Sequence, residues 1–545
     1  MTCKIQAIIK NIKNYYSIEY CISAIILALF ASAGGIGSIE KKMQSMVDNF
    51  ALATLIYILI KCLLLFVIFS IVLALVSYIN KKYNICGAKK NATRVDRKRK
   101  YFIATLIFIG ILLLWMPYYL TFYPGIVTYD SIESMKQIMG SAQYSDHHPW
   151  IYTVTVGIIY KIGYMITGNA NDAVGIYSFI SMLVMSSTFT YLIMYMYEKG
   201  AHTIFLALVY IFFAVDPTNA IYAITMWKDI FFAAIVLLFV IRIFNMQDEY
   251  DSGKINTKSW ILFALLSILL CVARSNGLYA YIIVAPATIW KFRRQLKPAL
   301  IYIMGVIIAV ALYKGPVMKS YDVRQPDILE SLHIPLQQMA CTIVNGGNIS
   351  TEDLNELNKI INVYQIPEFY ETDSADPIKE LIRNKGNLDY FNNHISEYAK
   401  IYIRIGLNNP YNYIKGYIMQ TNGFWYYNTK GYLFTRYLWK NDYGIERSPR
   451  CPVILQNTVN KIIDKYEAHP QWWNATAMIT WLFVVIMAIA RDNKKSLYPF
   501  IVIVALLLTI LIATPLAVEV RYVYYMWVTW PVFLLYSFQK NILEV

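Results

Sequence analysis

Hydrophobic positions in this chain form long, nearly uncharged runs separated by short polar segments. Residues 51–79 and 101–122 are two such runs. As helices that rise about 1.5 Å per residue, each is long enough to cross ~30 Å of hydrocarbon. The pattern predicts an all-α polytopic membrane protein.

The same pattern predicts about 12 transmembrane helices. The first follows basic residues, as a signal peptide does, but it is long enough to span, so we expect an uncleaved helix. The pair 259–274 and 277–291 is short for two full spans, and a tilted or re-entrant hairpin stays open as an alternative. The expected helices are 17–37, 51–79, 101–121, 173–197, 201–216, 230–247, 259–274, 277–291, 298–313, 475–490, 496–515 and 523–540.

Composition excludes a soluble globule. Hydrophobic residues make up 57% of the 545 positions and charged residues 15%, whereas soluble chains carry about 25% charged residues. The net charge of +15 is concentrated beside apolar runs, at 81–100, 291–297 and 491–495. Because this distribution is typical of cytoplasmic loops, we expect the lipid bilayer as a partner and no nucleic acid.

Residues 150–168 decide the predicted sidedness. The stretch is apolar enough to span, but it contains Lys161. If it crosses the membrane, segments 291–297 and 491–495 fall outside the cell. If it lies along the interface as a juxtamembrane helix, both fall inside together with 81–100. The positive-inside bias favours the interfacial helix, which places both termini of this multi-pass cell-membrane protein in the cytoplasm.

The chain then divides into four predicted parts. They are an N-terminal two-helix membrane segment with a basic cytoplasmic loop (1–100), a membrane core (101–313) whose first exterior loop is 122–172, an inserted α-rich exterior domain (314–473), and C-terminal transmembrane helices (474–545). In the exterior domain, Cys341 and Cys451 are the two cysteines that could form a disulfide. Its aromatic run 423–427 is expected to anchor the domain to lipid rather than to stack on a sugar.

Acidic and imidazole side chains gather in the first exterior loop. Asp130 could take a proton from a hydroxyl group or hold a divalent metal, although Asp130 with Ser131 would also cap a helix there. Asp146, His147 and His148 follow within about twenty residues. The histidines could act in acid–base chemistry, could join Asp130 or Asp146 in a metal site, or could simply begin the juxtamembrane helix.

Three basic residues are expected at outer helix ends, where they could hold a phosphate. They are Lys228, Arg274 and Arg521. The alternative is local ion pairing with the adjacent Asp229 and Glu519, which would join helix ends.

Taken together, these motifs resemble a known family. A membrane helix, an exterior loop with an acidic residue and a His-Pro entry into a juxtamembrane helix resemble the GT-C superfamily of polyprenyl-phosphate-sugar-dependent membrane glycosyltransferases. The resemblance runs from about residue 100 to the end and is closest to a group of uncharacterised bacterial multi-spanning proteins of this type. Its marks are Tyr123-Pro124-Gly125, Asp130-Ser131, His147-His148-Pro149, Trp227-Lys228-Asp229, Arg274-Ser275-Asn276-Gly277-Leu278-Tyr279 and Glu519-Val520-Arg521-Tyr522.

The resemblance implies a GT-C-like bundle that transfers a hexosyl or pentosyl group from a polyprenyl-phosphate donor to an extracytoplasmic glycan or protein of the cell envelope. It implies that Asp130 is the general base or a ligand of Mg²⁺ or Mn²⁺, and that Arg274 and Arg521 hold the donor phosphate. Two features depart from the family: helices precede residue 100, and Ser131 rather than a second acid follows Asp130.

Two other hypotheses remain open. A flippase or transporter of lipid-linked precursors would often show repeat symmetry, which this sequence lacks. A scaffold for envelope assembly would not need clustered carboxylates and imidazoles.

Overall fold

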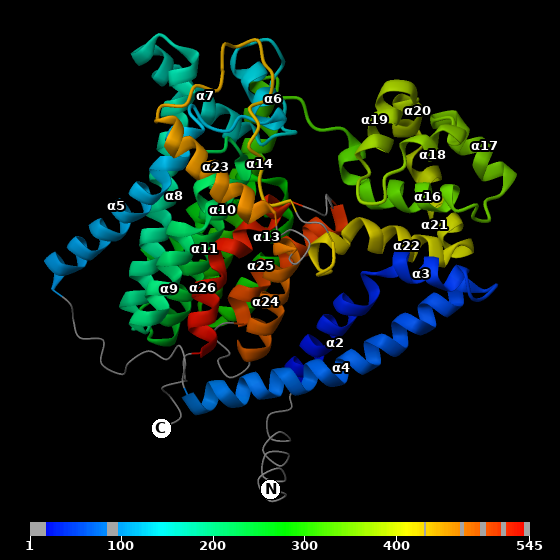
Figure 1. Cartoon of the computed structure of the whole chain (residues 1–545), viewed down its shortest axis with the longest axis horizontal. Helices are drawn as coiled ribbons and strands as arrows, with labels where there is room; N and C mark the ends of the chain where they lie inside the picture. Colours follow the sequence, from blue (N-terminus) through cyan, green and yellow to red (C-terminus); the bar gives the residue numbers. More distant parts are fainter. Residues whose placement is uncertain are drawn as a thin grey trace, which may run out of the picture.

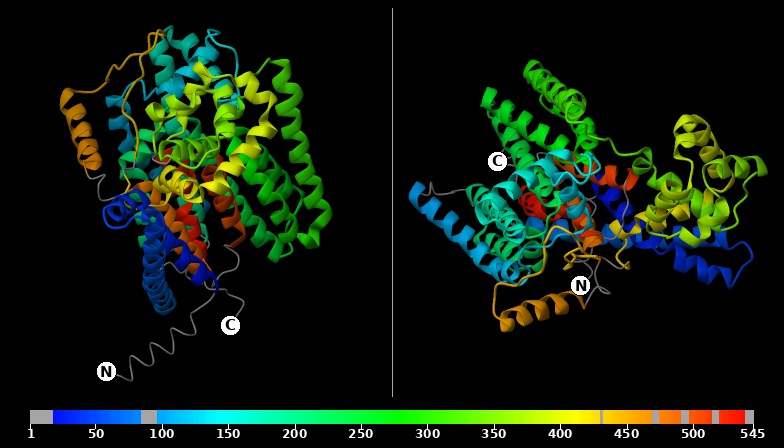
Figure 2. Two further views of the ribbon diagram at one scale, coloured as in Figure 1. Left: turned by 90° about the vertical axis from the view of Figure 1, so that its right-hand side faces the viewer. Right: turned by 90° about the horizontal axis from the view of Figure 1, so that it is seen from above.

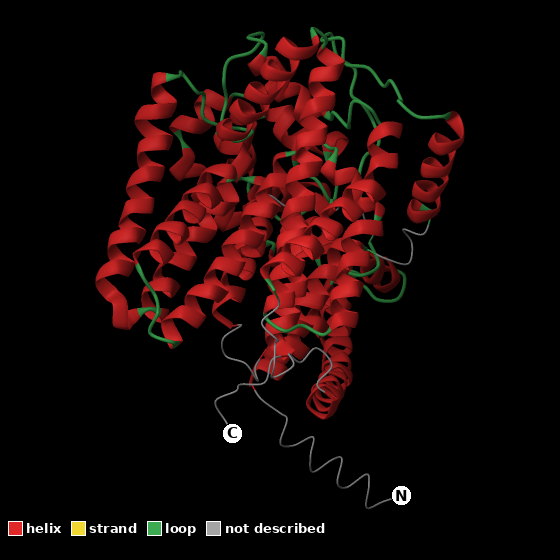
Figure 3. Ribbon diagram, turned by 90° about the vertical axis from the view of Figure 1, so that its left-hand side faces the viewer, coloured by secondary structure: helices red, strands yellow, loops and turns green. Residues whose placement is uncertain are grey.

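The computed structural model describes residues 18–83, 96–429, 432–468, 474–490, 497–513 and 519–538. In these ranges the chain is helical, and its only extended pairing consists of isolated bridges (Figure 3). The basic segment 491–495, most of 81–100 and both termini lie outside the described residues.

Every apolar run predicted to be a helix contains one. The all-α class is confirmed, and within the described ranges five helices are long and apolar enough to cross a membrane, or seven if each of two bent pairs counts as one span. The number of twelve spans stays a prediction. The bundle helices are α2 (Ile18–Ala33), α4 (Phe50–Tyr83), α5 (Arg97–Thr121), α8 (Ala170–Glu198), α9 (Thr203–Val215), α11 (Lys228–Asp251), α12 (Thr257–Ala273), α13 (Ser275–Lys291), α14 (Leu296–Leu312), α24 (Ala475–Ile489), α25 (Leu497–Ala513) and α26 (Tyr524–Phe538).

Helix α11 forms the centre of the bundle (Figure 1). It packs against α8, α12 and α26, while α5 and α9 flank α8, and α25 packs on α13. On the buried surface, Phe244 stacks on Tyr536 with ring centroids 3.9 Å apart. Because lipid tails are as apolar as these side chains, close packing of this kind holds membrane helices together.

The basic residues at the start of α5 and just before α14 lie at one end of the bundle. Lys100 pairs with Glu198 at the end of α8. Lys199, which follows Glu198 in the chain, pairs with Asp248 near the end of α11 across 2.7 Å. The backbone N–H of Arg294 donates to the Tyr250 hydroxyl. The other end of α5 leads into the loop 122–172, which was predicted to be exterior.

Helix α7 (Trp150–Thr167) crosses the loop-bearing end of the bundle (Figure 1). The hydroxyl groups of Tyr152 and Tyr177 lie 3.0 Å apart, and Gly163 packs against Ala173. Contacts spread over three turns of α7 thus fall within about one turn of α8. Helix α7 therefore packs against the first turns of α8.

The helix predicted to end at residue 313 continues. A π-helical turn (Tyr313–Val317) joins α14 to α15 (Met318–Ser320). This turn accommodates Pro316, and its Lys314 pairs with Asp146 across 2.6 Å.

A separate helical lobe follows, beside the bundle (Figures 1 and 2). Its own apolar core includes Leu329, Leu381 and Ile401. The lobe rests on the N-terminal α3 (Ile36–Gln44), where Lys415 pairs with Glu40 across 2.8 Å. Its helices are α16 (His333–Val344), α17 (Thr351–Ile360), α18 (Ile366–Phe369), α19 (Asp376–Lys385), α20 (Leu388–Asn393), α21 (Ile395–Asn408) and α22 (Pro410–Thr421).

One expectation for this region is wrong, and one open question is answered. Phe424, Trp425 and Tyr426 are buried inside the protein rather than anchored in lipid, because they fill the joint between the lobe and α2. Cys341 and Cys451 are both free. Cys341 is buried in the lobe, whereas Cys451 lies against Thr121 at the end of α5.

After this joint the chain returns to the bundle. We call residues 432–450 the strap, since they run over the loop-bearing end without forming a helix or a named strand. The following α23 (Val453–Glu467) packs on α5 at the outside of the bundle (Figure 2).

Candidate active site

Two loops are held side by side at the loop-bearing end. The N–H of Ile126 donates to the carbonyl of Ile224, and the N–H of Met226 donates to the carbonyl of Ile126, both across 2.9 Å. This parallel bridge brings the starts of α6 (Tyr129–Ile138) and α11 together. Residues about one hundred positions apart therefore form one site.

Helix α6 is capped by Thr128, so Asp130 is not the cap. The Thr128 N–H donates to the Ser131 hydroxyl across 3.0 Å, which completes a capping box. The Trp227 indole donates to the Thr128 hydroxyl across 2.8 Å. With the cap provided by Thr128, the Asp130 carboxylate is free for another role.

Gly125 permits the close approach of these loops. Its φ is +140°, and a Cβ atom there would lie 2.1 Å from the Ser178 hydroxyl and 2.8 Å from the Ile224 carbonyl. Any side chain would push the two loops apart.

Asp130 forms an ion pair with Arg521, whose Nη1 donates to Asp130 Oδ2 across 2.8 Å. Arg521 also pairs with Glu519 and lies over the Trp227 ring. Burial alone raises the pKa of the Asp130 carboxyl, but Arg521 and Lys228 outweigh burial, so this pKa lies well below its ordinary value. Asp130 is therefore ionised at neutral pH.

On the other side of Asp130, Lys228 contacts an imidazole. Its Nζ lies 2.7 Å from Nδ1 of His148. Because an ammonium group only donates, His148 accepts at Nδ1. Burial and the Lys228 charge lower the pKa of His148 to about 2, which keeps the ring neutral.

A second, deeper ion pair joins Asp229 to Arg274. Both side chains are almost fully buried, and Arg274 lies against the Tyr522 ring with a separation of 5.1 Å. The cluster thus contains as many carboxylates as cations, and its formal charge is balanced. Its members are Asp130, Asp229, Glu519, Lys228, Arg274 and Arg521.

The other two predicted site residues point elsewhere. Asp146 accepts the N–H of Trp150 at the start of α7 and pairs with Lys314, so it joins α7 to the π-helical turn that follows α14. His147 is half exposed, with Nδ1 4.0 Å from Glu330 of the lobe. In the described ranges, no three His, Cys, Asp or Glu side chains are close enough to hold a metal. Asp130 and His147 therefore do not belong to a three-residue ligand set in these ranges.

A cavity of about 340 Å³ opens beside Asp130. Thr128, Trp227 and Arg521 line its bundle side, and Tyr437 and Trp439 of the strap line the other side. Arg521 is the member of the predicted cation set that lines this cavity, while Lys228 and Arg274 lie behind the wall. The strap was missed in the sequence, where the aromatic-rich Tyr432–Trp439 run was the available signal.

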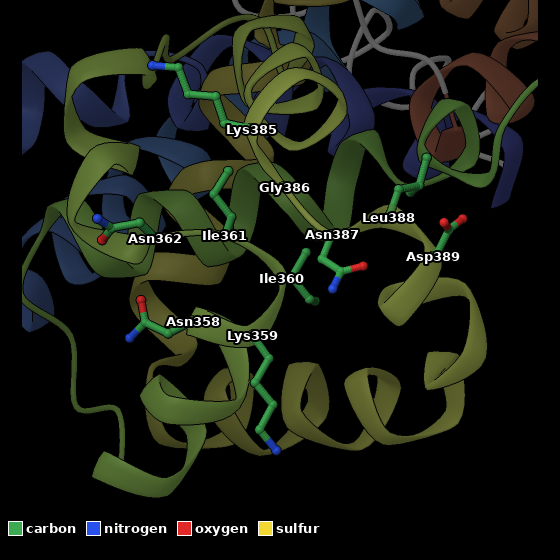
Figure 4. Close-up of a pocket in the computed structure, with 10 residues that line it drawn as sticks. All are labelled: Asn358, Lys359, Ile360, Ile361, Asn362, Lys385, Gly386, Asn387, Leu388 and Asp389. Atoms are coloured by element: carbon green, nitrogen blue, oxygen red, sulfur yellow. The ribbon is translucent and has the colours of Figure 1, made fainter.

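A second, more open groove of about 540 Å³ lies in the lobe (Figure 4). Asn358, Asn362 and Asn387 on its border each accept a backbone N–H at 3.0–3.1 Å. Their side chains thus build local turns, and the groove lacks a comparable cluster of ion pairs. We therefore place the candidate site at the cavity beside Asp130.

The comparisons with known proteins are brief. No curated protein and no solved structure matches the chain significantly. The sequence model of one family matches residues 139–542, which is most of the chain. The chain therefore belongs to this family, DUF6020, a family of unknown function.

Proposed function

We propose that this protein is a membrane glycosyltransferase of the GT-C type. It transfers a sugar from a polyprenyl-phosphate donor to a glycan or protein acceptor outside the cell. The observation that carries the proposal is the Asp130–Arg521 pair in the wall of a cavity between the membrane bundle and the strap. The cavity volume falls in the range of about 300–1,000 Å³ that small-molecule sites have.

Each member of the pair has a role in this reaction. Asp130 takes the proton of the acceptor hydroxyl as its oxygen forms a bond to the anomeric carbon. The bond from that carbon to the phosphate oxygen breaks, and the lipid phosphate leaves with the electron pair. The Arg521 guanidinium holds the departing phosphate through paired hydrogen bonds.

The low pKa of Asp130 gives the phosphate a second role. In the free protein Arg521 holds the pKa of the Asp130 carboxyl down, and a carboxylate with a low pKa is a weak base. A donor phosphate that engages Arg521 weakens this pairing and raises the pKa of Asp130. Asp130 thus becomes a stronger base when the donor is bound, which is when the reaction can proceed.

The predicted sidedness belongs to the same proposal. The site would face outward, because the basic residues Arg97–Lys100 and segment 291–297 lie at the opposite end of the bundle and basic loops favour the cytoplasm. The family model covers residues 139–542, which include Lys228, Arg274 and Arg521, whereas Asp130 lies just before this range.

Purified full-length protein in lipid nanodiscs tests the proposal. Undecaprenyl-phosphate hexoses and pentoses are supplied with an envelope extract as acceptor, and the release of undecaprenyl phosphate is measured. We expect acceptor-dependent consumption of at least one donor. A flippase would instead move the same lipids between the leaflets of a proteoliposome without consuming them, and that result would replace the proposal.

A further inference from the structure

The strap directs selected side chains into the cavity. Thr435, Tyr437 and Trp439 line it. Arg436 points the other way and pairs with Asp464 of α23 across 2.7 Å, and Leu438 packs into the apolar cluster around α6 and α7. From Thr435 to Trp439, the residues that line the cavity thus alternate with residues held elsewhere. The anchored residues therefore fix the direction of the residues that face the cavity.

The strap is fastened on both sides of this stretch. The N–H of Val520 donates to the Tyr432 carbonyl across 3.1 Å, and the N–H of Trp439 donates to the Val127 carbonyl across 2.8 Å. Arg447 adds side-chain hydrogen bonds to the carbonyls of Phe122 and Gly125. These contacts hold the aromatic residues at a set distance from Asp130 rather than on a loose loop.

Two aromatic residues of the strap are largely exposed at the cavity. Tyr437 is 73% exposed and Trp439 is 50% exposed. Across the opening, the Tyr129 ring meets Trp439 edge-on, with centroids 5.6 Å apart. Aromatic rings that stabilise a fold are normally buried, so rings held open beside a cavity are free to contact a ligand.

The opposite wall provides polar partners. Asp130 and Glu519 offer carboxylate oxygens, and Arg521 offers N–H groups. A sugar ring matches this pairing of walls, since its C–H face packs on an aromatic ring while its hydroxyl groups donate to carboxylates. An acidic sugar would place a third carboxylate beside Asp130 and Glu519, which favours an uncharged sugar.

We propose that Tyr437 and Trp439 form the subsite for an uncharged hexose or pentose ring of the lipid-linked donor, and that the strap determines which sugar is accepted. This inference rests on the proposed function. The alternative for exposed Tyr and Trp near a membrane is anchoring to lipid headgroups, and the experiment separates the two.

The test compares two probes, undecaprenyl phosphate and undecaprenyl-phosphate sugars, bound to full-length protein in nanodiscs of one lipid composition. The wild type should bind one sugar-bearing lipid more tightly than the bare lipid phosphate. Trp439→Ala and Tyr437→Ala should each weaken that binding by roughly 3- to 10-fold, as loss of an aromatic contact does. Affinity for bare undecaprenyl phosphate should not change, and Trp439→Phe should retain most of the preference.

Trp290→Ala is the matched control, because Trp290 is 69% exposed at the end of α13 and does not line the cavity. It should leave both affinities unchanged. If Trp439→Ala lowers the affinity for both lipids equally, or for neither, the subsite is refuted. The proposed function would still stand if the wild type prefers the sugar-bearing lipid. If the wild type neither prefers nor consumes any sugar lipid, the proposed function fails and the subsite fails with it.

Discussion

Replacing Asp130 with Asn removes one negative charge from the cluster and changes little else. The Asn oxygen can still accept the hydrogen bond that Arg521 donates across 2.8 Å, and Arg521 keeps its second carboxylate, Glu519. Because Arg521 stays charged, its hydrogen bond to Asn remains in the class that contributes about 1.5–3 kcal/mol, and what is lost is part of the attraction between the two charges. We therefore expect the free energy of unfolding to fall by only about 1 kcal/mol.

The effect on turnover should be far larger. Loss of a positioned base lowers kcat by roughly 10²–10⁴-fold. Affinity for the donor should not fall, because the cluster that remains carries an excess positive charge toward the phosphate. The expected pattern is thus a kcat reduced at least about a hundredfold with an unchanged or lower KM for the donor.

The assay is the rate of undecaprenyl phosphate release in nanodiscs, with thermal unfolding measured in parallel. Asp172→Asn is the matched control, since Asp172 pairs with Arg450 at the same end of the bundle but outside the cavity. It should show a comparable small loss of stability and normal turnover. A kcat for Asp130→Asn within about threefold of this control would refute the assignment of Asp130 as a base.

The pH profile provides an independent check on Asp130. In the free protein the pKa of its carboxyl is held below the ordinary value, and donor binding should release part of that depression. The acid limb of kcat, which reports the bound complex, should therefore lie at higher pH than the acid limb of kcat/KM. Coincident limbs would mean that the phosphate does not engage Arg521.

Three further predictions concern the structure around the site. Gly125→Ala should destabilise the protein by about 3 kcal/mol or more in denaturant unfolding, whereas Gly140→Ala, at a positive φ but with open space around it, should cost only about 1 kcal/mol. Asp146→Asn should lower stability by about 1–2 kcal/mol through loss of its ion pair with Lys314 while turnover persists, and a large fall in kcat would move the catalytic carboxylate to Asp146. Burial raises the pKa of the Glu519 carboxyl, so its charged form opposes folding at neutral pH. Glu519→Gln should therefore raise the melting temperature at pH 7. This gain should vanish below about pH 4, where the wild-type residue is protonated in both the folded and the unfolded protein.

The membrane helices could be predicted because apolar length is a local property of the sequence. Helix α5 begins four residues before its predicted start, which is the usual error for a boundary. The end predicted at residue 313 was wrong for a specific reason. Lys314 and Pro316 look like stop signals, but a π-helical turn absorbs the proline and Asp146 neutralises the lysine.

The site was harder to predict because its contacts are long-range. Asp130 and Asp146 look equivalent in the sequence, and only Lys314, 168 positions after Asp146, distinguishes them. The strap has no periodic apolar pattern, and its Trp439 is fastened to Val127, far earlier in the chain. A local sequence pattern identifies the residues that can take part in catalysis. It does not identify their long-range partners, which decide whether each residue is available for catalysis.

The way in which the strap is fastened has a consequence for divergence within the family. Its contacts with the bundle include main-chain hydrogen bonds, such as the N–H of Ser448 to Tyr123 and that of Arg450 to Leu120, which almost any residue supplies, and its side-chain anchors Arg436 and Arg447 lie outside the cavity. Exchanges at Tyr437 and Trp439 would therefore alter the cavity without loosening the strap. We expect related proteins to vary at these positions and to keep Arg447, so that one scaffold can acquire new substrates by a few substitutions.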